Sequence, residues 1–271
     1  MKAPSFAYAK PRALEEALAL LARAETKALA GGQSLIPSLN MRLSSPELLV
    51  DITGLAELKG IRLDKDVVRI GALATHAEIE RSEAVGKHVP LLAEAVRHVA
   101  HPAIRNRGTI GGSLALADPA AEYPACALAL DATLVVAGTE GRRQVKATEF
   151  FRGLFETALR PGELIVAVEI PVQAKGERTA FAELARRHGD YAIVGLAAFA
   201  ANGAKRLAFF GAADRAVLAA NAAQAKDLDA AKQALAKDLQ PPADLYHSSA
   251  TKLHLAGVLL ERTWNTLSTP R

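Results

Sequence analysis

The sequence predicts an α+β fold in three parts, and three observations support this prediction. Strand-like and helix-like segments alternate near the N-terminus, hairpin and helical patterns mix in the middle, and alanine-rich helical sequence follows strands near the C-terminus. A polar break with proline and glycine lies at residues 172–176. We therefore expect domains at residues 1–57, 58–174 and 175–271.

The first part reads as a small β-α-β unit. Its expected strands are residues 6–9, 27–30 and 48–52. One helix is expected from Pro11, because leucines follow it at spacings of four and three residues. A second helix is expected after Ser34, since Pro37 would then stand in the first turn, where a missing N–H is tolerated.

The second part opens with hairpin and helix signals. Two apolar runs within residues 58–72 flank a charged turn and predict a β-hairpin. Thr75 and Glu78 have the spacing of a capping box, which predicts a helix start. A longer helix is expected from Pro90 until Pro102 stops it.

A further helix is predicted from Pro119, with Asp118 as its acidic N-cap and Glu122 in its first turn. Strands are expected at residues 133–137, around Val145 and at 164–170. In the third part, strands are expected at residues 180–186, 191–200 and 205–211. Helical sequence with a break at Pro241 and Pro242 is expected to follow.

Composition excludes several classes of protein. Hydrophobic residues at 50% and charged residues at 23% are typical of a folded globular chain, and a net charge of +4 is too small to indicate nucleic-acid binding. Residues 1–10 lack the apolar core of a signal peptide, and residues 191–201 are too few to span a bilayer. We therefore expect a cytoplasmic protein without a membrane span.

Cys126 is the one cysteine of the chain. A single thiol excludes intrachain disulfides and any iron–sulfur cluster ligated by this chain alone. We interpret Cys126 as a small buried apolar side chain.

Two glycine pairs suggest a site for a diphosphate. Gly31 and Gly32 lie between a predicted strand and a predicted helix, and Gly111 and Gly112 lie next to hydroxyl-bearing residues. Glycine lets backbone N–H groups approach a phosphate closely. The chain has neither the Gly-x-Gly-x-x-Gly spacing of a Rossmann fold nor the Gly-Lys-Ser/Thr of a P-loop.

Three segments carry a resemblance to a known family: Ala30-Gly31-Gly32-Gln33-Ser34-Leu35, Arg107-Gly108-Thr109-Ile110-Gly111-Gly112-Ser113 and Ala117-Asp118-Pro119-Ala120-Ala121-Glu122. They resemble the FAD-binding medium subunit of molybdenum hydroxylases, as in the carbon monoxide dehydrogenase and xanthine dehydrogenase family. Ser113 stands where many members have Asn. The resemblance covers residues 6–219 and implies a two-subdomain FAD-binding fold of the vanillyl-alcohol-oxidase/PCMH type with a C-terminal α+β domain.

The resemblance also implies the residues that contact FAD. These are Ala30, Gly31, Gly32, Gln33, Ser34, Leu35, Thr109, Ile110, Gly111, Gly112, Ser113, Asp118, Glu122 and Tyr191. Tyr191 belongs to a segment that lies beside the flavin in relatives, although a core aromatic is the alternative. Glu122 is expected to accept hydrogen bonds from sugar-like hydroxyls, because a carboxylate would repel the diphosphate. No acid–base catalytic residue and no metal ligand is expected.

The implied function is electron transfer within an oxidoreductase complex. A large molybdopterin subunit and a small subunit with [2Fe–2S] clusters would be partners, in a dimer of heterotrimers, and electrons would pass through FAD to an external acceptor such as quinone, NAD or oxygen. The alternatives are a stand-alone FAD-dependent oxidoreductase of the same fold, and a nucleotide-binding scaffold without redox work.

Two groups of side chains leave their roles open at this stage. Arg105 and Arg107 are either surface charges or partners of the diphosphate. Glu94, His98 and His101 would share a helical face and could hold a metal, but a solvated face is the preferred interpretation.

Overall fold

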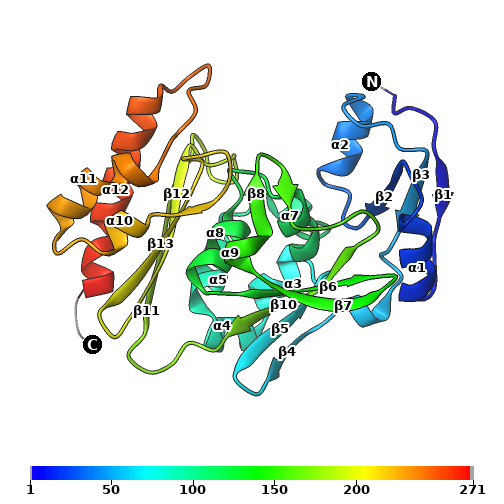
Figure 1. The fold of residues 1–271 in the computed structure, drawn as a ribbon, viewed down its shortest axis with the longest axis horizontal. Coiled ribbons are helices and arrows are strands. Elements are labelled where there is room, and N and C mark those ends of the chain that lie inside the picture. The colour runs from blue at the N-terminus through cyan, green and yellow to red at the C-terminus, as the bar shows by residue number, and fades with distance from the viewer. Residues whose placement is uncertain (1, 269–271) are drawn as a thin grey trace.

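The computed structural model describes residues 2–268, so residue 1 and residues 269–271 of the expected domains lie outside the described part. Its strands form sheets of three, five and four strands and one two-stranded hairpin. The three larger sheets follow one another along the long axis, with the two termini at opposite ends (Figure 1). Each of these sheets lies within one of the three predicted domains, whose boundaries stay a prediction.

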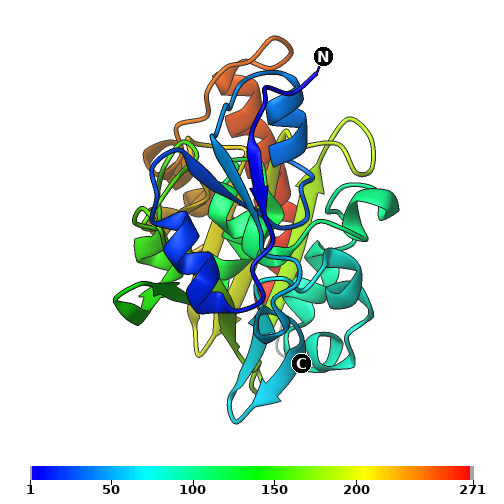
Figure 2. The same ribbon diagram turned by 90° about the vertical axis from the view of Figure 1, so that its right-hand side faces the viewer.

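The first sheet is parallel, as a β-α-β unit requires. Its strands are β1 (Ala7–Ala9), β2 (Thr26–Leu29) and β3 (Leu48–Asp51), with β3 in the middle, and Figure 2 views the molecule from this end. Its helices are α1 (Leu14–Leu21) and α2 (Leu35–Asn40), the latter with Pro37 in its first turn as expected. The expected start of α1 at Pro11 is wrong, because Ala13 is extended and the Arg12 N–H donates to the Glu16 carboxylate at 3.0 Å.

The central sheet is antiparallel and confirms the predicted hairpins. Its strands, in spatial order, are β4 (Ile61–Asp64), β5 (Val67–Gly71), β10 (Leu164–Pro171), β6 (Thr133–Gly138) and β7 (Gly141–Lys146). The strand that is last in sequence, β10, therefore lies in the middle, paired with β5 and β6. A small hairpin of β8 (Phe151–Gly153) and β9 (Glu156–Thr157) comes between β7 and β10 in the sequence.

Short helices fill the middle domain. They are a 3₁₀ turn at Ala56–Leu58, α3 (His76–Arg81), α4 (Glu83–His88), α5 (Pro90–Ala95), α6 (Pro102–Arg105), α7 (Ile110–Leu116), α8 (Glu122–Ala129) and α9 (Ala147–Phe150). The capping box of Thr75 and Glu78 is confirmed at the start of α3. The long helix expected from Pro90 is wrong: α5 ends at Ala95, Ala100 has a left-handed φ of 46°, and Pro102 begins α6 instead of ending a helix.

The helix expected from Pro119 also begins elsewhere. Asp118 does not cap α8, because its carboxylate accepts a hydrogen bond from the Ala120 N–H at 2.9 Å and closes a separate turn. That turn follows Ala117, which ends α7 with a left-handed φ of 52°. Glu122 still lies in the first turn of α8, as predicted, because α8 begins at this residue.

The third sheet is antiparallel, with strands β11 (Arg178–Leu184), β12 (Val194–Ala201), β13 (Ala204–Phe210) and β14 (Val217–Leu218) in that order. The expected start of a strand at Tyr191 is wrong by three residues, since β12 begins at Val194. Helices α10 (Ala220–Ala223), α11 (Leu228–Asp238) and α12 (Ser249–Ser268) cover its outer face (Figure 1). Within residues 2–268, no helix is long and apolar enough to cross a membrane.

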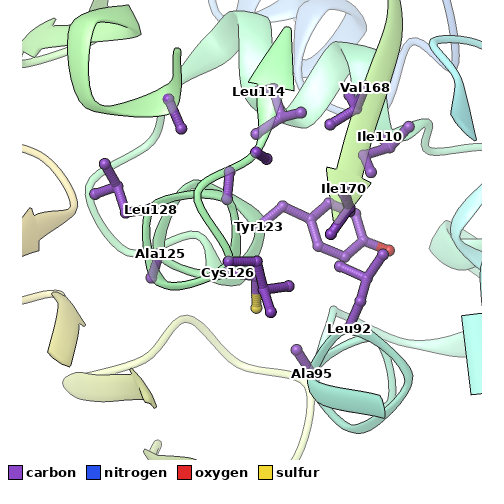
Figure 3. Close-up of a cluster of buried hydrophobic side chains, with 14 of the residues drawn as sticks. Leu92, Ala95, Ile110, Leu114, Tyr123, Ala125, Cys126, Leu128, Val168 and Ile170 are labelled. Atoms are coloured by element: carbon purple, nitrogen blue, oxygen red, sulfur yellow. The ribbon is translucent and has the colours of Figure 1, made fainter. Parts of the chain in front are cut away.

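Helix α8 is the centre of the largest core. All eight of its residues are buried, and Tyr123 and Cys126 lie among leucine, isoleucine and alanine side chains from α5, α7 and β10 (Figure 3). The expectation that Cys126 is a buried apolar side chain is confirmed. Because this core joins α8 to both larger sheets, it fixes the first turn of α8 and therefore Glu122.

Candidate functional site

A pocket of about 550 Å³ opens at the first glycine pair. Its lining residues are Lys10, Leu29, Ala30, Gly31, Gly32, Gln33, Ile36, Pro37, Asp51, Thr53 and Arg107. Among the described residues, no hydrogen-bond acceptor is seen for the backbone N–H groups of residues 32–35. Free amide groups that line a pocket are suited to bind an anion.

The two glycine segments meet at the edge of this pocket. A Cβ atom on Gly31 would lie 2.1 Å from the carbonyl oxygen of Arg107 and 2.8 Å from the Cα of Gly108. Only glycine allows two backbones to approach so closely. Gly31 therefore fixes the position of the first segment against the second.

The charges of the pocket are mixed. Lys10 lies 3.2 Å from the carboxylate of Asp51, which also accepts hydrogen bonds from Tyr8 and Thr53. Burial would raise the pKa of Asp51, but the hydrogen bonds from Thr53, Tyr8 and Lys10 outweigh it and lower this pKa to about 2. Asp51 is thus a fixed anion that orients the ammonium group of Lys10 at the pocket.

The two arginines whose roles were open have different environments. Arg107 is exposed and lines the pocket, where its charge can reach an anion. Arg105 is buried, donates to Glu80 at 3.0 Å, and donates to the carbonyl oxygens of Val99 and Ala100. Arg105 therefore forms a structural ion pair with Glu80 and is not a surface charge.

The second glycine pair does not form the open loop that the sequence suggested. Gly111 and Gly112 lie in the first turn of α7, and their N–H groups already donate to the carbonyl oxygen of Ala72 at 2.9 Å and to the hydroxyl of Thr109 at 3.2 Å. A Cβ on Gly111 would lie 2.6 Å from the Cβ of Ala72. Close packing of α7 on the segment after β5, and not amide groups aimed at a ligand, accounts for Gly111.

Three acidic or phenolic side chains gather where the second and third domains meet. Glu122 is only 9% exposed, and burial together with the charge of Asp118 raises its pKa to about 7. Burial likewise raises the pKa of Asp118, and burial followed by the charges of Asp118 and Glu122 raises the pKa of Tyr191. The ring of Tyr191 is nevertheless 72% exposed, so its interpretation as a core aromatic is wrong.

The metal alternative finds no support in the described part of the chain, which holds no cluster of three metal-ligating side chains. Helix α5 ends at Ala95, so Glu94, His98 and His101 do not share a helical face. His98 is half-buried and packs its ring at 5.0 Å from Phe181 and 5.7 Å from His188, so its interpretation as part of a solvated face is also wrong.

Sequence reasoning missed several residues at the pocket and at the group of acids between the second and third domains. Lys10 and Thr53 line the pocket from the ends of β1 and β3, and Glu183 on β11 reaches the acidic group of the domain boundary. Parallel pairing of β1 with β3 brings Lys10 beside Asp51, so a correct sheet order was the signal that could have found Lys10. A lone glutamate within an expected strand gave no comparable signal for Glu183.

Comparison with known proteins finds a matching family and several similar proteins. The family described as "FAD binding domain in molybdopterin dehydrogenase" matches residues 4–173. The 6-hydroxypseudooxynicotine dehydrogenase complex subunit alpha of Paenarthrobacter nicotinovorans is 39% identical over 279 residues, which cover 97% of this chain and 94% of that protein. The carbon monoxide dehydrogenase medium chain of Hydrogenophaga pseudoflava is 41% identical over 196 residues, or 72% of this chain and 68% of that one.

A solved structure also matches nearly the whole chain, including the third domain. The carbon monoxide dehydrogenase structure from Hydrogenophaga pseudoflava superposes with a TM-score of 0.94 at 36% identity and covers 98% of both chains. This match, like that of the first relative, therefore includes the segment after residue 219, which the sequence resemblance did not cover.

Proposed function

Because the chain belongs to the family of FAD-binding domains in molybdopterin dehydrogenases, as the FAD-binding medium subunit of a molybdenum hydroxylase, we propose that it carries electrons between partner subunits and an external acceptor. Bound FAD would supply the redox chemistry, since amino-acid side chains alone do not accept electron pairs in this way. This chain would bind, orient and shield that cofactor.

The observation that carries the proposal is the pocket with free amide groups. Residues 32–35 offer N–H groups that have no acceptor among residues 2–268, and Lys10 and Arg107 add positive charge at the same pocket. A diphosphate needs hydrogen-bond donors and cations, and the residues that line this pocket supply both. The residues present therefore fit FAD at its phosphates, with Gly31 and Gly32 among the residues that line the pocket.

The second glycine segment would serve the cofactor differently. The amide groups of residues 110–113 are internally paired, so Thr109, Ile110, Gly111, Gly112 and Ser113 would shape the site by their packing. Asp118, Glu122 and Tyr191 would contact the flavin end, because acids without cationic partners suit hydroxyl and N–H donors and not phosphates.

The partners follow from chemistry that this chain lacks. Two [2Fe–2S] clusters would need about eight cysteine ligands, but this chain has only Cys126, and it is buried. Relatives are named as a subunit of a dehydrogenase complex and as a medium chain. We therefore place the clusters and molybdopterin on a small and a large partner subunit, in a cytoplasmic dimer of heterotrimers.

The purified single chain should carry an oxidised-flavin absorption band, accept electrons from an artificial donor or a pyridine nucleotide, and oxidise no organic substrate alone. Addition of the partner subunits should produce substrate-dependent bleaching of the flavin. Steady-state substrate oxidation by the single chain, free of molybdenum and iron, would instead identify a stand-alone oxidase. A colourless chain that takes up no FAD would identify a non-redox scaffold.

Replacement of Glu122 by alanine should weaken FAD binding by roughly 1–3 kcal/mol, because a buried hydrogen-bond donor of the cofactor would lose its acceptor. Glu122→Gln should cost less, since the amide oxygen still accepts a hydrogen bond. Titration of the flavin-free chain with FAD, followed by fluorescence quenching, gives the dissociation constants. An unchanged constant for the alanine variant would leave Glu122 with only its place at the start of α8.

A further inference from the structure

Glu183 is an acid of the C-terminal domain with an unexplained environment. Its Oε2 atom is fully buried and has no hydrogen-bond partner among residues 2–268. Most buried polar atoms in folded proteins are hydrogen-bonded, so an orphaned oxygen points to a partner that binds there. Burial, followed by the charge of Glu122, raises the pKa of Glu183 to about 8.

Strand geometry places Glu183 toward the FAD-binding part of the chain. Side chains alternate along β11, so Glu183 shares a face with Phe181, which packs in the core around α8, while Ala180 and Leu184 pack on the opposite side with α12. The two domains are joined nearby, because the Gly211 N–H donates to the carbonyl oxygen of Pro119 at 2.7 Å.

Glu122 of the other domain is close enough for its charge to raise the pKa of Glu183. Its side chain is more than nine-tenths buried, and no hydrogen bond to another side chain is seen for it among the described residues. Its own backbone N–H is the one group that lowers its pKa. No lysine or arginine is among the groups that shift the pKa of either glutamate.

Several titratable groups surround this pair of glutamates on the packed elements. They are Asp118 before α8, Tyr123 on α8, Glu94 on α5, and His98, His188 and Tyr191 on the adjoining segments. The charged side chains that raise the pKa of the two glutamates are acids, Asp118 for Glu122 and Glu122 for Glu183. Such an arrangement repels phosphate and suits a ligand with several hydrogen-bond donors.

We propose that Glu183 is a further cofactor-contacting residue, which together with Glu122 accepts hydrogen bonds from hydroxyl or N–H groups of the bound flavin nucleotide. The inference rests on the proposed function, since it takes FAD as the ligand. It adds to Tyr191 a second cofactor-contacting residue of the C-terminal domain, which the family match to residues 4–173 leaves out.

The test is FAD affinity of the flavin-free full chain, measured by fluorescence quenching. Glu183→Ala should weaken binding at least about tenfold, and the isosteric Glu183→Gln by a smaller factor. Glu140→Gln is the matched control, because Glu140 is an exposed glutamate of the β6–β7 turn. This control should bind FAD like the parent chain.

The pH dependence gives a second readout, which a purely structural residue would not produce. Because the free acids hold protons near neutral pH and accept hydrogen bonds more strongly when ionised, FAD binding should release protons. Affinity of the parent chain should therefore rise at least about fivefold from pH 6 to pH 8.5, and Glu183→Gln should reduce that rise.

The possible outcomes distinguish a failure of the role of Glu183 from a failure of the proposed function. Parent-like affinity of Glu183→Ala, or an affinity of the parent chain that falls as the pH rises, overturns the role of Glu183. A parent chain that binds no FAD at any pH refutes the proposed function itself. A variant that binds normally but unfolds at lower urea concentration shows a structural role only, and this outcome also overturns the inference.

Discussion

Replacement of Gly31 by valine is expected to abolish retention of FAD. Any Cβ at this position would lie 2.1 Å from the carbonyl oxygen of Arg107 and 2.8 Å from the Cα of Gly108, and backbone atoms cannot move aside as a flexible side chain can. The segment with the free amide groups of residues 32–35 would then be displaced from its place against Arg107. We expect affinity to fall at least about 100-fold, or ~2.7 kcal/mol.

The measurement is the flavin-to-protein absorbance ratio after purification, followed by titration with FAD. Gly86→Ala is a suitable control, because Gly86 lies inside α4 and a Cβ there would meet no atom within 4 Å. That variant should keep its flavin and gain about 1 kcal/mol of stability from better helix propensity. Full flavin occupancy in Gly31→Val would show that the first segment does not hold the diphosphate.

The second large effect concerns stability. Gly111→Val should lower the free energy of unfolding of the flavin-free chain by about 3 kcal/mol, because its Cβ would lie 2.6 Å from the Cβ and 2.7 Å from the carbonyl oxygen of Ala72. The same movement would break the hydrogen bond from the Gly111 N–H to Ala72. Urea unfolding before any FAD is added measures this effect.

Gly112→Ala provides the comparison for this variant. A Cβ on Gly112 would have one close neighbour, the Thr109 hydroxyl at 3.0 Å, which can rotate. We expect its loss of stability to be less than about 1 kcal/mol. If Gly111→Val unfolds at the same urea concentration as the parent chain, then Gly111 is not a packing residue and its earlier assignment to the cofactor would return.

The sequence was sufficient for most strands because their signals are local. Alternation in residues 67–71 and the turn after Asp64 predicted a hairpin that pairs as expected. Helix boundaries were less predictable, because Ala117 ends α7 in a left-handed conformation and α5 ends at Ala95, in both places without a glycine to signal it. Asp118 and Pro119 have a strong helix-start pattern, but the Asp118 carboxylate accepts a hydrogen bond from the Ala120 N–H and forms a local turn instead of a helix cap.

The site was predictable where motif and backbone agree. The free amides of residues 32–35 lie where the first glycine pair suggested them. The second pair has the same composition, yet its N–H groups donate to the carbonyl oxygen of Ala72 and to the hydroxyl of Thr109. Spacing along the chain does not show that the segment packs against Ala72. Glu183 could not be selected for the same reason, because only the packing of the third sheet against α8 brings it near Glu122.

The central position of β10 also has a consequence for the order in which the protein can form during synthesis. Strands β5 and β6 each pair with β10, so neither has its inner neighbour until residues 164–171 have left the ribosome. Until then, both strands present open edges to other nascent chains. The central sheet is complete only after nearly two-thirds of the chain has been synthesised. The scaffold for the cofactor therefore forms only late in translation.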